Sequence, residues 1–182
     1  FNKEGIISFK NVITFNMDEY VGLPETHSQS YHYYMYNNFF NHIDIDKENI
    51  NILNGMVKKY EDECKRYEEK ILEVGGIDLF LGGVGVDGHI AFNEPGSSFK
   101  SRTREKQLTE DTIIANSRFF NNDITKVPQS ALTVGVSTIM DAKEIVLIAF
   151  GPKKIHAIKG LVEGPITEEV PASILQNHPK VT

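Results

Sequence analysis

The chain has 182 residues, 40% of them hydrophobic and 24% charged, as expected for one globular domain with a sizeable core. The formal net charge of −6 argues against nucleic acid or an acidic membrane surface as the main partner. Cys64 is the only cysteine, which excludes an internal disulfide and fits a reducing, cytoplasmic compartment. No apolar run is long enough to cross a bilayer.

Short apolar runs alternate with helical patterns along the chain. Strands are predicted at 12–15, 50–53, 77–81 and 145–150, while 131–136 could be strand or loop. Helices are predicted at 30–42, 57–73, 108–120 and 152–163, with a loop at 123–128 and a short helix beginning at 170–175. This alternation predicts an α/β fold with a mainly parallel sheet flanked by helices on both faces, Rossmann-like and three-layered. We expect residues 1–182 to form a single domain.

Polar residues follow three of the predicted strands. Parallel sheets bind ligands outside the carboxyl ends of their strands. The residues at these ends are Asp18 and Glu19 after the first strand, Asp87, His89 and Glu94 after the third, and Lys153 and Lys154 after the last. Three strand ends therefore supply candidate residues for one site.

The segment Leu79–Ser98 carries the strongest chemical signal. His89 stands between Asp87 and Glu94, and carboxylates near an imidazole favour its charged form and can select its tautomer. The glycines of this segment spell G-x-G-x-x-G, but Asp87 would place a negative charge beside a dinucleotide phosphate, so a nicotinamide cofactor is not expected. The other histidines are scattered, and no metal site is predicted.

Each of the remaining candidate residues has a structural interpretation as well as a functional one. Asp18 or Glu19 could be a general base with a pKa raised by burial, or could cap a turn or face water. Lys153 and Lys154, at the start of a predicted helix, could hold an anion such as a substrate phosphate, or could be solvated surface residues. Arg118 is a second candidate for the phosphate, although a lone arginine is more often a surface residue.

Long motifs distributed along the chain resemble the glucosamine-6-phosphate deaminase (isomerase) family. The motifs are FNMDEYVGLP, GGVGVDGHIAFNEPGSS, SRTREKQL, ANSRFF, VPQSALTVGVSTIMDA and GPKK. The resemblance implies conversion of glucosamine 6-phosphate and water to fructose 6-phosphate and ammonia, without a metal or organic cofactor.

The resemblance also implies roles for individual residues. Asp18 matches the base that moves a proton between C2 and C1, and His89 matches the residue that assists ring opening, tuned by Asp87 and Glu94. Arg118 and Lys154 match ligands of the substrate phosphate. Some bacterial relatives are hexamers activated by N-acetylglucosamine 6-phosphate, and the matching positions here are Ser97, Arg104, Lys106 and Glu144.

The family also has an N-terminal strand with a phosphate-binding loop and a C-terminal tail, neither of which matches any part of this chain. We therefore expect the 182 residues to be an incomplete fragment with little activity alone. A 6-phosphogluconolactonase-like enzyme shares the fold, but the MDEY and NEPG motifs favour the deaminase. A non-catalytic sugar-phosphate sensor is the third alternative, although such a domain need not keep both Asp18 and His89.

Overall fold

The computed structural model describes residues 2–182, which divide into two compact units. The first comprises the residues up to Lys58 together with Gln107–Leu132, and the second comprises Lys59–Lys106 and Thr133–Thr182. The chain passes from one unit to the other three times, so each unit is built from two separate segments. The interpretation of the chain as a single domain stays a prediction.

The first unit contains two short pairs of strands. Strands β1 (Thr14–Phe15) and β3 (Ile50–Asn51) are parallel, with Thr14 opposite Ile50. Strand β2 (Asp18–Tyr20) lies next to β6 (Ser130–Thr133) in a second sheet. The unit also holds helices α1 (Tyr31–Asn38) and α3 (Glu110–Asn116) and 3-10 turns at Phe40–His42, Lys47–Asn49, Ser117–Phe119 and Ile124–Lys126.

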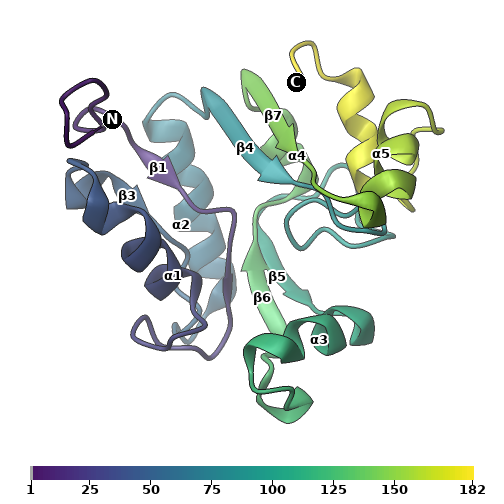
Figure 1. Cartoon of the computed structure of the whole chain (residues 1–182), viewed down its shortest axis with the longest axis horizontal. Helices are drawn as coiled ribbons and strands as arrows, with labels where there is room; N and C mark the ends of the chain where they lie inside the picture. Colours follow the sequence, from purple (N-terminus) through teal and green to yellow (C-terminus); the bar gives the residue numbers. More distant parts are fainter. Residues whose placement is uncertain (1) are drawn as a thin grey trace. The chain divides into compact units, whose positions relative to one another are not determined.

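The second unit is organised around the parallel strands β4 (Leu79–Gly83) and β7 (Glu144–Ile148), which lie side by side in Figure 1. Their register runs from Leu79 opposite Glu144 to Gly83 opposite Ile148, so both strands end at the same edge. The helices of this unit are α2 (Tyr60–Glu73), α4 (Val136–Met140) and α5 (Ile155–Val162), with 3-10 turns at Pro152–Lys154 and Pro171–Asn177. Strand β5 (Arg104–Gln107) lies where the chain returns to the first unit.

Helix α2 buries a stripe formed by Cys64, Tyr67 and Ile71, spaced three and four residues apart as one helical face requires. Cys64 is 4% exposed. Burial, with the negative charges of Glu63 and Glu105, raises the pKa of its thiol to about 11. A thiol so rarely ionised is a poor nucleophile, which supports a packing role for this cysteine.

The predicted α/β class is confirmed, with parallel strands flanked by helices. Three elements differ from prediction. Asp18–Tyr20, expected after a strand, is itself a buried strand. Strand β5 was not predicted because its four polar residues show no alternation of apolar side chains. The strand alternative for 131–136 is confirmed by β6, and helix α4 follows it in a segment for which no element was predicted.

Candidate active site

Glu19 stabilises the start of helix α1 in the first unit through hydrogen bonds. Its carboxylate accepts hydrogen bonds from the backbone N–H groups of Tyr20 at 2.8 Å, Tyr31 at 3.0 Å and His32 at 2.8 Å. Two of these donors belong to the first turn of α1, where free N–H groups and the helix dipole favour a negative charge. Burial raises the pKa of Glu19 despite these bonds. The capping role considered for this acidic pair therefore belongs to Glu19.

Asp18, the other acidic residue of β2, has the electrostatics of an acid–base group. It is 7% exposed, and burial together with the neighbouring charge of Glu19 raises its pKa from 3.8 to about 7. A carboxyl group titrating near neutral pH can both accept and return a proton. Burial is the larger cause, as desolvation disfavours the charged carboxylate.

The charges of Asp18 and Arg118 both act on the phenol of Tyr20. Burial and the charge of Asp18 raise the pKa of the Tyr20 phenol to about 12, while Arg118 acts in the opposite direction. The phenol oxygen accepts a hydrogen bond from Asn116 Nδ2 at 2.9 Å. The exposed guanidinium of Arg118 lies over the ring of Phe119, 4.6 Å from its centroid. Arg118 thus lies near enough to Tyr20 for its charge to act on the phenol.

In the second unit, His89 is held by Asp87. His89 Nδ1 lies 2.7 Å from Asp87 Oδ1, and the His89 backbone N–H donates to the same oxygen at 3.2 Å. The hydrogen bond from His89 is the main reason that the pKa of Asp87 is lowered. An ionised Asp87 stabilises the tautomer with the proton on Nδ1, which leaves Nε2 free to accept a proton.

Gly85 allows the His89 ring to occupy its position. A Cβ atom at residue 85 would lie 2.2 Å from His89 Cε1 and 2.3 Å from Nδ1, closer than any real contact. The Gly85 N–H also donates to the His89 carbonyl at 2.8 Å. This glycine is therefore explained by close packing of the imidazole and not by a dinucleotide phosphate.

Glu94 and Asn93 belong to the same loop and are both buried. Glu94 is 1% exposed, and its carbonyl accepts from Ser97 N at 3.0 Å. Asn93 donates to the carbonyls of Ile90 and Val134, each at 2.9 Å, and accepts from Arg104 Nη1 at 2.9 Å. The sequence offered Asn93 only as part of the NEPG motif, next to the catalytic candidate Glu94.

Lys154 shares a strand edge with the His89 loop. Its Nζ donates to the carbonyl of Val84 at 2.6 Å, directly after the end of β4. Lys154 also lines a pocket of about 480 Å³ with Gly151 and Ile155. The 3-10 turn Pro152–Lys154 precedes α5, so Lys154 lies in the N-terminal turn as expected, whereas Lys153 is exposed.

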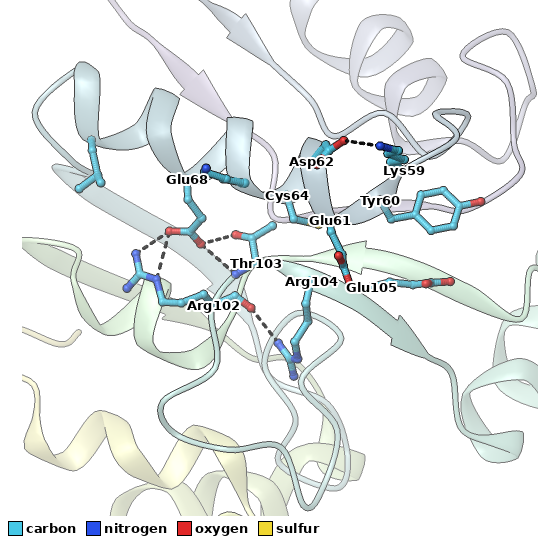
Figure 2. A pocket seen from close by; sticks show the side chains of 12 residues that line it. Lys59, Tyr60, Glu61, Asp62, Cys64, Glu68, Arg102, Thr103, Arg104 and Glu105 are labelled. Carbon is cyan, nitrogen blue, oxygen red and sulfur yellow. Dashed lines mark hydrogen bonds and ion pairs between the residues drawn. The ribbon is translucent and has the colours of Figure 1, made fainter.

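A larger pocket of about 1160 Å³ lies between α2 and residues 102–105 of the second unit. Figure 2 shows Glu68 reaching from α2 towards Arg102 and Thr103. Burial would raise the pKa of Glu68, but hydrogen bonds from Thr103, Thr138 and Arg102 outweigh it and lower the pKa. Arg104 also lines this pocket, and burial lowers the pKa of its guanidinium.

The four positions matched to an activator site are distributed over different elements of the second unit. Arg104 lines the larger pocket, Ser97 is buried in the loop after Glu94, and Glu144 pairs with Lys180 at 2.5 Å at the start of β7. Lys106 is half-buried in β5. Across residues 2–182, no hydrogen bond or ion pair joins two of these four side chains.

Residues 2–182 contain neither a metal-binding cluster of side chains nor a helix able to span a membrane. No group of three or more histidine, cysteine, aspartate or glutamate side chains is arranged to hold a metal ion. None of the helices in this range combines the length and the apolar character needed to cross a bilayer.

Residues 2–182 match the family described as glucosamine-6-phosphate isomerases/6-phosphogluconolactonase. The chain therefore belongs to this family. A Fusobacterium nucleatum protein named glucosamine-6-phosphate deaminase is 80% identical over 180 residues, which are 99% of this chain and 66% of that protein. A Dictyostelium discoideum protein of the same name is 65% identical over 179 residues, covering 98% of this chain and 67% of that protein. The chain thus spans about two thirds of the length of these relatives.

Solved structures show the same fold. A structure described as a monomeric glucosamine-6-phosphate deaminase has a TM-score of 0.96 at 45% identity, covering 100% of this chain and 75% of that one. A 6-phosphogluconolactonase from Thermotoga maritima has a TM-score of 0.75 at 19% identity, covering 98% of this chain and 74% of that one. The second likeness concerns the fold alone.

Proposed function

We propose that the protein containing this chain converts glucosamine 6-phosphate and water to fructose 6-phosphate and ammonia. The observation that carries the proposal is Asp18, a buried carboxyl group with a pKa of about 7 in a chain 80% identical to a protein named as this deaminase. The pair formed by His89 and Asp87 supplies a second acid–base group on a different loop. The reaction needs both.

Ring opening is the task of His89. The anomeric hydroxyl must lose a proton and the ring oxygen must gain one, and a histidine can perform both transfers near neutral pH. Asp87 holds Nδ1 at 2.7 Å, so Nε2 is the nitrogen that faces the sugar. Glu94, buried in the same loop, orients this acid–base group.

Isomerisation is the task of Asp18. Its carboxylate removes the C2 proton from the open-chain aldehyde while O1 gains a proton from the C2 ammonium group, giving an enol-amine, and then returns the C2 proton to C1. The resulting imine at C2 adds water and releases ammonia, leaving the ketone of fructose 6-phosphate. Arg118 and Lys154 bind the substrate phosphate, a role that suits their positive charge and their match to the phosphate ligands of the family.

The direct test follows ammonia release from glucosamine 6-phosphate by the protein at the full length of its gene product. Loss of 6-phosphogluconolactone is followed in parallel, because the family description covers both activities. We expect ammonia release and no lactone hydrolysis above the spontaneous rate. Lactone hydrolysis without ammonia would reassign the protein to the lactonases, and binding of sugar phosphate without either reaction would make it a sensor.

We further propose that Ser97, Arg104, Lys106 and Glu144 contribute to an activator site for N-acetylglucosamine 6-phosphate. Two features support this role. The Ser97 hydroxyl is buried without a hydrogen-bond partner among residues 2–182, and the Arg104 hydrogen bonds go only to the neutral oxygens of Asn93 and Arg102. Ammonia release measured with and without this compound tests the site, and sedimentation of the same samples tests for a hexamer. An unchanged rate at saturating compound would remove the proposal.

A further inference from the structure

The loop that carries His89 and Glu94 has little regular structure to hold it. Between the end of β4 at Gly83 and the start of β5 at Arg104, its regular pairing is a single antiparallel bridge between Ile90 and Asn93. Ala91, inside this bridge, has φ of +52°, a left-handed conformation that residues other than glycine keep only when their surroundings impose it. Individual side-chain contacts, together with the backbone hydrogen bonds to the carbonyls of His89 and Glu94, therefore set the positions of these two residues.

The side chain of Asn93 makes three of these contacts. It is completely buried, and its Nδ2 donates to the carbonyl of Ile90 within the loop and to the carbonyl of Val134 after β6. The first bond closes the turn immediately after His89. The second attaches the turn to a segment that adjoins α4, which begins at Val136. Glu94 follows Asn93 directly, and Ile90 follows His89, so this amide is linked to the backbone next to both residues, while His89 is also held by Asp87.

Arg104 determines which way the amide points. A guanidinium can only donate hydrogen bonds, so the atom 2.9 Å from Arg104 Nη1 must be the amide oxygen. The amide nitrogen is then directed at the two carbonyl oxygens, as the donor pattern requires. The arrangement uses both N–H donors of the amide, and a carboxylate of the same shape could not replace them.

We propose that Asn93 is a positioning residue that fixes His89 and Glu94 relative to the segment after β6, with Arg104 setting the orientation of its amide. The proposal rests on the proposed function for its kinetic consequence. Loss of the two donor bonds releases the turn that follows His89. Small displacements of acid–base groups reduce the chemical step far more than substrate binding, by about 10- to 100-fold.

The test compares Asn93→Asp with Thr138→Val in the full-length protein. Asn93→Asp keeps the shape and the acceptor for Arg104 but sets carboxylate oxygens against two carbonyls. Thr138→Val is the matched control, since it removes a buried side-chain bond of the same unit, from Thr138 Oγ1 to Glu68 Oε1 at 2.6 Å, outside the loop. Asn93→Ala is the second variant, which removes all three bonds without adding charge.

We expect both Asn93 variants to lower kcat for ammonia release about 10- to 100-fold with KM changed less than about threefold, while Thr138→Val keeps kcat within about twofold. The ¹⁵N imidazole shifts of His89 should move in the Asn93 variants and stay at wild-type values in Thr138→Val. Wild-type kcat with unmoved His89 shifts in folded Asn93→Asp would overturn the proposal, as would equal losses in Thr138→Val. If the wild type releases no ammonia, the proposed function fails, and the His89 shifts alone decide the role of Asn93.

Discussion

Strand β2 of the first unit and the His89 loop of the second shift the pKa of an aspartate in opposite directions. Asp18 lies in a buried strand and has its pKa raised to about 7, whereas Asp87 lies on a loop and has its pKa lowered by its hydrogen bond with His89. One environment therefore prepares a carboxyl group to exchange protons, and the other keeps a carboxylate charged to orient an imidazole. The same residue type serves two purposes because desolvation dominates in one unit and hydrogen bonding in the other.

The largest expected effect tests the first half of this contrast. Asp18→Asn keeps the shape of the side chain but removes the proton-accepting group, and general-base catalysis contributes about 10²- to 10⁴-fold. We expect kcat for ammonia release to fall by that amount, with substrate binding retained. Calorimetric binding of glucosamine 6-phosphate and the ammonia assay measure the two parts. The control is Asp46→Asn, an exposed position whose side chain makes no cap hydrogen bond. Near wild-type turnover by Asp18→Asn would show that another group is the base.

A second substitution acts on the loop side of the contrast. Gly85→Ala would place a Cβ atom 2.2 Å from His89 Cε1, so the ring must move away from its place beside Asp87. We expect kcat to fall about 10- to 100-fold, because the proton-transfer geometry is lost. Gly83→Ala is the control, since its Cβ would lie at an ordinary 3.5 Å from the Ile148 carbonyl. Equal activity of the two variants would mean that the position of His89 next to Gly85 is unimportant for turnover.

The raised pKa of Asp18 also predicts how stability depends on pH. Between pH 3.8 and about 7 the folded protein keeps this proton while the unfolded chain has lost it, so Asp18 makes folding less favourable as pH rises through this window. Relative to wild type, Asp18→Asn should gain up to roughly 4 kcal/mol of unfolding free energy from the bottom of the window to the top. Urea denaturation at several pH values measures this gain. A constant difference between the two proteins would contradict the raised pKa.

The smallest expected effect distinguishes the contribution of Glu19 from that of Asp18, the two acidic residues of β2. Glu19→Gln removes a negative charge that raises the pKa of Asp18, so the acidic limb of the pH–rate profile should move to lower pH. The weakened cap of α1 should cost about 1 kcal/mol of stability, because charged acceptors hold backbone N–H groups more strongly than amides do. Glu48→Gln, at an exposed position of the same unit, is the control and should shift neither quantity. An unmoved acidic limb would exclude Glu19 as a cause of the Asp18 pKa.

The sequence predicted those parts of the molecule that depend on local patterns. The apolar runs of β4 and β7 indicated parallel strands, and their shared edge accounts for Lys154 lying near Val84. The helix predicted at 57–73 corresponds to α2 at Tyr60–Glu73. The sequence could not predict that Glu19, and not Asp18, accepts from the first turn of α1, or that Asn93 is the centre of a hydrogen-bond cluster. Their partners are 12 or more residues away in one case and lie on three separate segments in the other.

The buried thiol of Cys64 can also be used to measure how often helix α2 opens locally. Because it is the only cysteine and its side chain is 4% exposed, its reaction with a thiol-specific reagent should become faster when α2 separates from its packing partners. The labelling rate at increasing reagent concentration would then give the opening rate of α2, in the way that amide exchange reports on backbone hydrogen bonds. No engineered probe is needed for such a measurement within the second unit.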